Sequence, residues 1–429
     1  MHGFCDIRLG GDPDQCIPPE ITTTARRNKG AASAMALNRA RSRHDKPTCV
    51  LVLQGGGGLG AYHIGAYQAL AEHQFEPDWF CGISIGAINA AVLAGNPPET
   101  RLARIEGLWR AISRPNLLPP FDNVVARMFL NNLSNAQALA FGQPAFFRPR
   151  LVNPYLAPAG TAATESFYDT SPLCETLQQF ADFDLINRKK VRISVGATDV
   201  ETGGLVFFDN TKLEKPFAPE HVMASGSLPP GFPATKIEGR FYWDGGCVSN
   251  TPLEAVLNDT PRGHTVVFMI DLWSAAGAPP TTINEVLWRA KQIQYASRAA
   301  HHIDSVATKL NLRRATRLLQ ERDGTTANAA VPDSVALASD QRIDILHIIY
   351  HPGEDQIPAS DAEFSRASIT ERRAAGYADM RKALAEQPWL RTEKPEHLGA
   401  MIHRVSRGRV TTLAEPNLRT TSDRTALAL

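Results

Sequence analysis

Two patterns of hydrophobic residues alternate along the chain, short apolar runs and longer segments with helical spacing. The run from Cys49 to Leu53 is apolar at every position, which is typical of a parallel strand buried on both faces. Helical spacing follows over residues 61–70, and a second apolar run near residues 78–81 leads into another helix. This order of strand and helix predicts an α/β domain that begins at residue 48.

The alternation continues through most of the chain. Strands are predicted over residues 191–198, 205–208, 265–272 and 343–350. Helices are predicted over residues 99–113, 172–183, 220–225 and 362–386, with one or two long helices over residues 283–320. The pattern therefore predicts a sheet with helices inserted between its strands.

Residues 115–170 interrupt this regularity, because they are rich in Asn, Pro and aromatic residues. One interpretation is a cap inserted over the functional site, with aromatic side chains that line an apolar pocket. The other is a separate hydrophobic cluster beneath a long loop. The aromatic residues in question are Phe121, Phe129, Phe141, Phe146, Phe147 and Phe167.

Composition and charge narrow the possible partners. The 429 residues include 45 basic and 44 acidic ones, so the net charge of +1 indicates neither a nucleic-acid partner nor an acidic substrate. Six cysteines without C-x-x-C spacing favour reduced thiols and a cytoplasmic setting. No apolar run approaches the ~18 residues of a transmembrane segment, so any membrane contact is expected to be peripheral.

The two ends of the chain differ from its middle. Residues 1–47 are basic and poor in apolar residues, which predicts a disordered arm, with contact to an anionic membrane surface as the alternative. We divide the remainder into a domain over residues 48–257 and a C-terminal extension over residues 258–429 that completes or packs on it. The tail from about residue 388 is expected to be loose.

Glycines follow the first strand and precede the first helix, in the spacing G-x-G-x-x-G. This spacing is found in dinucleotide-binding loops, which also need an acidic residue at the end of the second strand. Here Asp78 lies at the start of that strand instead. Backbone N–H groups free of side chains can equally form an oxyanion hole. The candidate donors are Gly55, Gly56, Gly57, Gly58 and Gly60.

A serine follows the second strand within the sequence Gly82-Ile-Ser84-Ile-Gly86. This G-x-S-x-G spacing is typical of a nucleophile elbow, a sharp turn between a strand and a helix. The turn is strained, so the residues two before and two after the serine must be small. Ser84 is therefore the candidate nucleophile, placed at a helix N-terminus where negative charge is stabilised.

A third stretch delivers Asp244 from an aromatic strand into Gly245 and Gly246. An aspartate followed by two residues without side chains leaves room for another group to approach it. Burial beside Tyr242 and Trp243 would raise the pKa of its carboxyl and make it a better base. The alternative is an ordinary Asp-Gly turn.

Together the three stretches resemble the patatin-like phospholipase family, in the same order and with matching segments at Ser225–Pro233 and Asn250–Leu253. The resemblance covers about residues 50–257, and Leu59 departs from the Lys or Arg often found before the last glycine. It implies a three-layer α/β/α sandwich with a mainly parallel sheet, here with a mainly helical C-terminal extension. It also implies a serine hydrolase that cleaves acyl esters of lipids without a cofactor or metal. By resemblance, Ser84 and Asp244 form the catalytic dyad, and Gly55 to Gly60 form the oxyanion loop.

One further alternative concerns the catalytic base. In α/β-hydrolases a histidine follows the nucleophile and the acid in chain order, and His264, His347 and His351 all follow Asp244. A Ser-Asp-His triad therefore stays open beside the dyad, as does nucleotide binding by the glycine loop.

Overall fold

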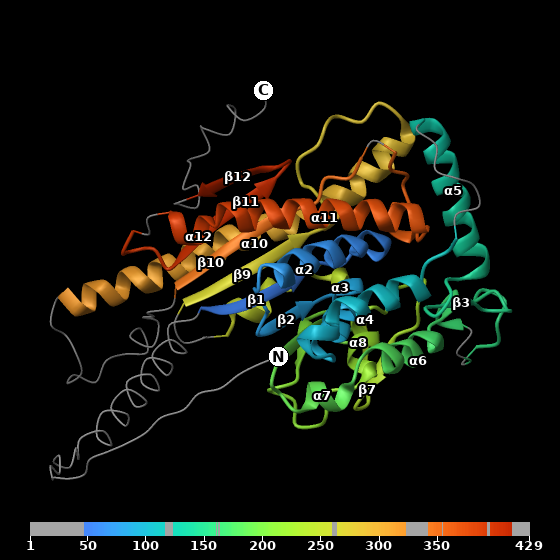
Figure 1. Ribbon diagram of the computed structural model, residues 1–429. Helices are drawn as coiled ribbons and strands as arrows, with labels where there is room; N and C mark the ends of the chain where they lie inside the picture. The colour runs from blue at the N-terminus through green and yellow to red at the C-terminus, as the bar shows by residue number, and fades with distance from the viewer. Residues whose placement is uncertain are drawn as a thin grey trace, which may run out of the picture. The chain divides into compact units, whose positions relative to one another are not determined.

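The apolar run after Pro47 forms strand β1 (Thr48–Leu53), an inner strand of a ten-stranded sheet within the described part of the chain. The strand order is β12-β11-β10-β9-β1-β2-β5-β8-β7, and β6 also pairs with β5 (Figure 1). The bounds of these strands are β2 (Trp79–Gly82), β5 (Arg192–Asp199), β6 (Leu205–Asp209), β7 (Thr235–Ile237), β8 (Arg240–Asp244), β9 (His264–Asp271), β10 (Arg342–Ile349), β11 (Ala400–Ser406) and β12 (Arg409–Leu413).

The computed structural model describes most of the chain from Pro47 onward, and these residues belong to one compact unit. The arm expected over residues 1–47 lies outside the described residues, apart from Pro47. The described ranges are 47–115, 123–159, 161, 164–259, 264–322, 342–353, 355–392 and 395–413.

The pairing is parallel from β11 across to β5 and antiparallel at the margins. Strands β11, β10, β9, β1, β2 and β5 all run in the same direction. Strands β12, β6, β8 and β7 are antiparallel to their partners. The mainly parallel central sheet expected from the sequence is therefore confirmed.

Helices cover both faces of this sheet, which explains why β1 is apolar at every position. Leu51 and Leu53 point into the larger cluster, with side chains of α2, α3, α4, α6, α8 and α11. Val50 and Val52 point the other way, into a cluster with α9 and α10. Successive strand residues face opposite sides, so burial on both faces requires a continuous apolar run. The architecture has three layers, α/β/α.

The remaining helices and short turns have the following bounds: η1 (Gly57–Ala61), α2 (Tyr62–Glu72), α3 (Ile85–Ala94), α4 (Pro98–Ala111), α5 (Val124–Phe141), α6 (Ser171–Phe180), α7 (Phe183–Asn187), α8 (Pro219–Ser225), η3 (Gly245–Cys247), α9 (Leu253–Leu257), α10 (Ile283–Arg322), η5 (Ser360–Ala362), α11 (Arg366–Glu386) and α12 (Pro388–Arg391). Among the described residues, none of these helices is both long and apolar enough to cross a lipid bilayer.

The C-terminal extension contributes to the sheet as well as to the helical layers. Strands β10 to β12 continue the sheet beyond β9, and α11 lies along α2 (Figure 1). The two helices approach closely at Gly65 and Gly376, where an added Cβ would overlap with the opposite backbone. The expectation of a loose tail from about residue 388 is wrong for the residues that the structure describes there, because they include β11 and β12. Strand β11 forms there because it pairs with β10 along most of its length.

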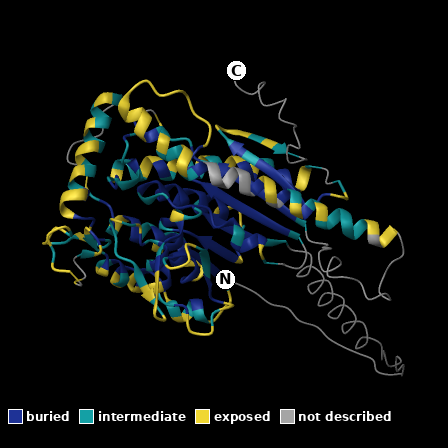
Figure 2. Ribbon diagram, turned by 180° about the vertical axis from the view of Figure 1, so that it is seen from behind, coloured by how far each residue is buried: buried dark blue, intermediate teal, exposed yellow. Residues whose placement is uncertain are grey.

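The segment proposed as a cap contains a long helix and a small hairpin. Helix α5 is mostly exposed or half-buried, whereas the central strands are buried (Figure 2). After α5 the chain forms the short pair β3 (Arg148–Pro149) and β4 (Tyr168–Asp169). The segment is therefore more regular than its composition suggests.

Candidate active site

Ser84 occupies the sharp turn between β2 and α3. Its backbone has φ 56° and ψ −126°, a conformation that residues with a side chain rarely adopt. The backbone N–H of Ser84 lies 3.0 Å from Oγ of Ser225 and 3.2 Å from its carbonyl oxygen. Ser225 in turn donates its hydroxyl to the carbonyl of Gly196, at 2.6 Å. The strained turn is thus tied to α8 and β5.

The glycines on either side of Ser84 are needed for close backbone approach, as the sequence predicts. A Cβ on Gly82 would overlap with the carbonyl oxygen of Gly86, and a Cβ on Gly86 would overlap with that of Leu53. The turn therefore fits against the end of β1 only because both positions lack a side chain.

Asp244 meets Ser84 because of the register of the sheet. Gly82 of β2 pairs with Val195 of β5, so the chain two residues later is level with Ala197. Beyond the end of β2, Ala197 pairs on that same side with Asp244 of β8, whereas Val206 of β6 pairs with it on the other side. The Ser84 hydroxyl donates a hydrogen bond to the Asp244 carboxylate. The backbone N–H of Gly246 donates a second, at 2.7 Å.

Burial makes Asp244 a stronger base than an ordinary aspartate. Its side chain is 2% exposed, and desolvation raises the pKa of the carboxyl from 3.8 to about 6. The hydrogen bonds from Ser84 and Gly246 act in the opposite direction, because they stabilise the ionised form. Near neutral pH this carboxylate is ionised and holds a proton more strongly than a solvated one.

The glycine loop is fixed by two side chains that hold one carbonyl. Asn250 Nδ2 and Trp273 Nε1 both donate to the carbonyl oxygen of Gly55, each at 2.9 Å. In a planar trans peptide the carbonyl and the following N–H point in opposite directions. Holding the Gly55 carbonyl therefore orients the Gly56 N–H away from these side chains.

The five candidate oxyanion glycines do not share one environment. Gly56 and Gly57 line the same cavity as Ser84 and Asp244. The N–H of Gly55 donates to the Asn250 carbonyl at 3.1 Å and is already used. Gly58 and Gly60 are buried, the first against the backbone of Glu363 and the second against Ile85. The geometry narrows the candidate donors to Gly56 and Gly57.

Residues of the C-terminal extension close the other side of the loop. A Cβ on Gly57 would overlap with the carbonyl oxygen of Asp361. Asp361, Ala362 and Phe364 line the cavity, and Lys291 of α10 pairs with the Asp361 carboxylate at 2.6 Å. The buried Arg372 donates to the carbonyl of Glu363 at 2.8 Å. The extension thus forms one wall of the site.

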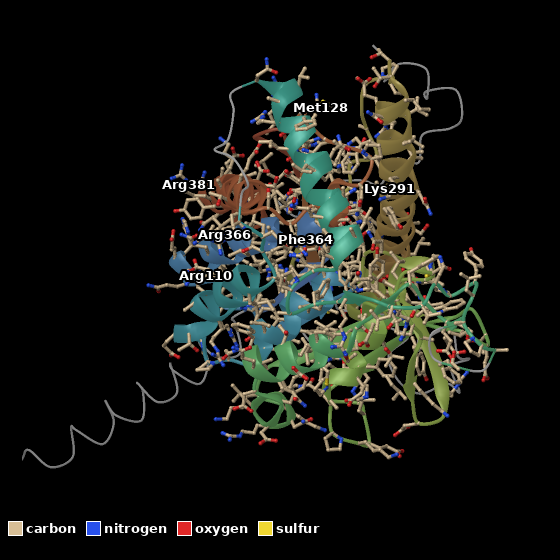
Figure 3. All side chains as sticks on the ribbon, turned by 90° about the vertical axis from the view of Figure 1, so that its right-hand side faces the viewer. Arg110, Met128, Lys291, Phe364, Arg366 and Arg381 are labelled. Carbon is tan, nitrogen blue, oxygen red and sulfur yellow. The ribbon has the colours of Figure 1, made fainter. Side chains whose placement is uncertain are left out.

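The cavity at Ser84 has a volume of about 310 Å³, and its lining is largely apolar. Phe146, Phe147 and Tyr168 from the cap segment contribute to this lining, together with Phe232 and Phe364. Their rings contact one another, with centroids of Phe147 and Phe232 5.1 Å apart. Phe364 is labelled in Figure 3.

The other aromatic residues of the cap segment have different places. Phe129 and Phe141 are exposed, and Phe167 is at the margin of exposure. Phe121 lies outside the described residues. Two of the six predicted aromatics, Phe146 and Phe147, therefore line the cavity.

The three histidines that follow Asp244 all contact other groups. His347 Nε2 lies 2.7 Å from the Asp271 carboxylate. His264 pairs with Asp344, and His351 Nε2 lies 2.7 Å from the hydroxyl of Ser406. Nothing in these contacts brings a histidine ring to Asp244 or Ser84.

Some residues of the site escape sequence reasoning. Asn250 enters the sequence analysis only as part of the matching segment Asn250–Leu253, and Trp273, Tyr295 and Asp361 are not among its candidate site residues. Tyr295 of α10 lines the cavity, and burial together with the charges of Asp361 and Asp244 raises the pKa of its phenol. The segment Asn250–Leu253 was one available signal, because it matched a family segment.

Comparison with known proteins identifies the family of the chain. The model of a family described as "Patatin-like phospholipase" matches residues 51–257, and one described as "Patatin phospholipase" matches residues 293–396. A triacylglycerol lipase of Arabidopsis thaliana, SDP1L, is 34% identical over 71 residues, which are 17% of this chain and 9% of that protein. The chain thus matches only a small part of that relative's length.

Solved structures with some likeness include VipD from Legionella pneumophila, with a TM-score of 0.30 and 14% identity over 77% of this chain and 66% of that chain. Another is full-length ExoU of Pseudomonas aeruginosa in complex with SpcU, with a TM-score of 0.21 and 21% identity over 44% of this chain and 40% of that chain. The family models span both Ser84 and Asp244 and most of the extension, and on them the chain belongs to the patatin-like phospholipase family.

Proposed function

We propose that the protein hydrolyses carboxylic acyl esters of lipids through an acyl intermediate on Ser84, with Asp244 as the base. The observation that carries this proposal is the hydrogen bond from Ser84 to a buried Asp244 at the wall of an apolar cavity. The family membership supports ester hydrolysis, and the aromatic lining of the cavity suits an acyl chain.

Acylation follows from these positions. Ser84 Oγ attacks the ester carbonyl carbon while its proton passes to the Asp244 carboxylate. The carbonyl oxygen takes up negative charge and accepts hydrogen bonds from the N–H groups of Gly56 and Gly57. When the intermediate collapses, the bond to the alcohol breaks and the alcohol takes the proton from Asp244. Ser84 is left as an acyl ester.

Deacylation repeats the same steps with water. Asp244 accepts a proton from the water that attacks the acyl carbon, and then returns it to Ser84 Oγ as the fatty acid leaves. A base whose pKa of about 6 lies just below neutral pH serves both directions of transfer, because it is ionised yet basic enough to accept a proton.

The geometry does not favour nucleotide binding by the glycine loop. A pyrophosphate requires open space beside the loop and the N-terminus of the following helix. Here the backbone of Asp361 and Glu363 covers Gly57 and Gly58. Asp78 accepts a hydrogen bond from the N–H of Cys49 at 2.9 Å, at the start of β2 rather than at its end.

Labelling with a fluorophosphonate tests the proposed function. We expect one adduct per chain, mapped to Ser84 by mass spectrometry and missing from Ser84→Ala. The reagent mimics the tetrahedral intermediate, so it reacts only where a serine is activated beside oxyanion donors. An adduct on another serine, or NAD or FAD binding measured by calorimetry on the unlabelled protein, would contradict the proposal.

A second expectation concerns the side chains that hold Gly55. Trp273→Phe removes the donor to the Gly55 carbonyl but keeps an aromatic ring against Trp288 and Tyr295. We expect kcat to fall about 3- to 10-fold with little change in KM, since one hydrogen bond that orients the oxyanion donor is lost. Steady-state kinetics on a water-soluble ester measure this.

The matched control is Trp288→Phe, which makes the same change of ring on the neighbouring side chain. Trp288 is buried and packs at a tilt against Trp273, with ring centroids 5.3 Å apart, but does not line the cavity. We expect its kcat to stay near the wild-type value. Equal losses in both variants would mean that ring packing, and not the bond to Gly55, supports catalysis.

A further inference from the structure

Apolar side chains are exposed along α5, although a surface helix normally buries its apolar stripe. Val125, Phe129 and Leu133 follow one another at the spacing of one helical turn and are exposed by 74%, 66% and 37%. Near the end of the helix, Phe141 is exposed by 73%. Such exposed apolar residues on one helix mark a surface that contacts another apolar body.

This region also has very few charged side chains. Helix α5 has one charged residue, Arg127, and this side chain pairs with Asp355 at 3.5 Å. Residues 151–159, between β3 and β4, carry no charged side chain and expose Leu151 and Leu156. A surface without acidic residues meets little resistance when it leaves water for an apolar medium.

The exposed apolar residues are continuous with the cavity at Ser84. Leu139 of α5 lines the cavity and is half exposed. Leu228, which follows α8, also lines the cavity and is also exposed to solvent. An acyl chain entering past Leu139 would therefore stay in contact with apolar side chains. Figure 3 faces α5, with Met128 labelled on it and Lys291 labelled on α10.

We propose that α5 and residues 151–159 form a docking face that rests on the surface of a lipid aggregate and feeds acyl chains into the cavity. The docking face comprises Val125, Phe129 and Leu133 of α5, together with Leu151 and Leu156. The proposal rests on the proposed function, because continuity with a cavity for acyl chains favours lipid over a second copy of the chain or a protein partner.

The attraction at this face is apolar rather than electrostatic. Helix α10 carries Arg289 and Lys291 near the cavity, but Arg289 donates to the carbonyls of Ser274 and Ala275, and Lys291 pairs with Asp361. Further along the helix, the described basic side chains begin at Lys309, roughly 20 Å from Tyr295 at the cavity. Among them Arg314 donates to the carbonyl of Glu396, and Arg317 pairs with Glu321. Binding at the docking face should therefore depend little on salt.

Flotation with vesicles of phosphatidylcholine in high salt tests the docking face. We expect the wild type to float with the vesicles. The partition coefficient of the double variant Phe129→Ser with Leu133→Ser should be at least about tenfold lower, because two large apolar side chains are lost. Hydrolysis of a water-soluble short ester should be unchanged, because neither residue lines the cavity. Hydrolysis of an ester embedded in the vesicles should fall with the partitioning.

The matched control is Leu312→Ser with Leu319→Ser, two exposed leucines on the part of α10 distant from the cavity. The proposal is overturned if this pair lowers partitioning as much as the α5 pair, or if the α5 pair changes nothing. It is also overturned if light scattering shows a wild-type dimer that the α5 pair dissociates while neither protein floats. If neither the wild type nor any variant hydrolyses an ester, the proposed function fails. The flotation result still shows whether the docking face binds lipid.

Discussion

Asp244→Asn should lower kcat by about 10²- to 10⁴-fold on a water-soluble ester, the range that a positioned general base contributes. An amide cannot accept the Ser84 proton, yet it has nearly the same shape and keeps an oxygen for the Gly246 N–H. We therefore expect KM and the fold, followed by circular dichroism, to stay close to those of the wild type. The loss then reports on chemistry and not on structure.

The pH dependence of the wild type should follow the pKa of the same carboxyl. Only the ionised form accepts a proton, so kcat/KM should be level above about pH 7 and fall tenfold per pH unit below the pKa of about 6. In Asp244→Asn this limb should be missing from the residual activity. A wild-type limb near pH 4 would mean that Asp244 is not the base.

The same variant should be more stable than the wild type at high pH. A shift of the pKa from 3.8 to about 6 corresponds to about 3 kcal/mol that folding spends on burying the charge. Folding takes up a proton at Asp244 between these pH values, so wild-type stability falls as pH rises through them. Asn carries no charge, so denaturant unfolding should show its advantage at pH 8 and none below pH 4.

His351→Ala is the control for a histidine in the mechanism. His351 is half-buried and contacts Ser406, so its loss should leave most of the activity. The same outcome is expected for His264→Ala and His347→Ala once folding has been verified. A collapse of kcat in any of the three folded variants would restore the Ser-Asp-His alternative.

Gly57→Ala should lower kcat/KM by about 10²-fold or more and also destabilise the protein. The residue has φ +54°, and its added methyl group would overlap with the carbonyl oxygen of Asp361. Either the loop or the wall formed by the extension must move, which displaces the N–H groups proposed as oxyanion donors. Losing one such donor costs about 10²- to 10³-fold in kcat. Steady-state kinetics and denaturant unfolding measure the two effects.

Gly203→Ala separates the backbone effect from the overlap. Gly203 has φ +67°, and a Cβ there would have nothing within 4 Å. We expect a loss of stability of about 1 kcal/mol from the left-handed backbone alone, with unchanged kinetics. If Gly57→Ala were no worse than this control in either measurement, the contact with Asp361 would not position the loop.

Local pattern predicted most of the regular elements and the two principal side chains. Strand β1 and the turn at Ser84 are specified by residues next to each other in sequence, a buried apolar run and glycines that permit a strained turn. Helix α10 was expected as one or two helices and is continuous. Strand β11 was missed because its pattern is mixed, with His403 and Arg404 between apolar residues, and because its formation depends on pairing with β10.

The completed site depends on contacts that no local pattern encodes. Asn250, Trp273 and Asp361 act on the glycine loop from segments far along the chain. Their role follows only from the tertiary structure, since each would be unremarkable in its own segment. For the same reason the sequence suggested five oxyanion glycines where the folded loop leaves two facing the cavity.

The wall supplied by the extension has a consequence for the order in which the chain is synthesised. Ser84 and Asp244 leave the ribosome well before residues 361–364, which back the glycine loop and line the cavity. Strand β10 and helix α11, which hold that wall in place, are also made late. A nascent chain that ends near residue 257 carries the whole segment matched by the first family model but only part of the cavity, so hydrolytic competence should arise only after residues 361–364 have been translated.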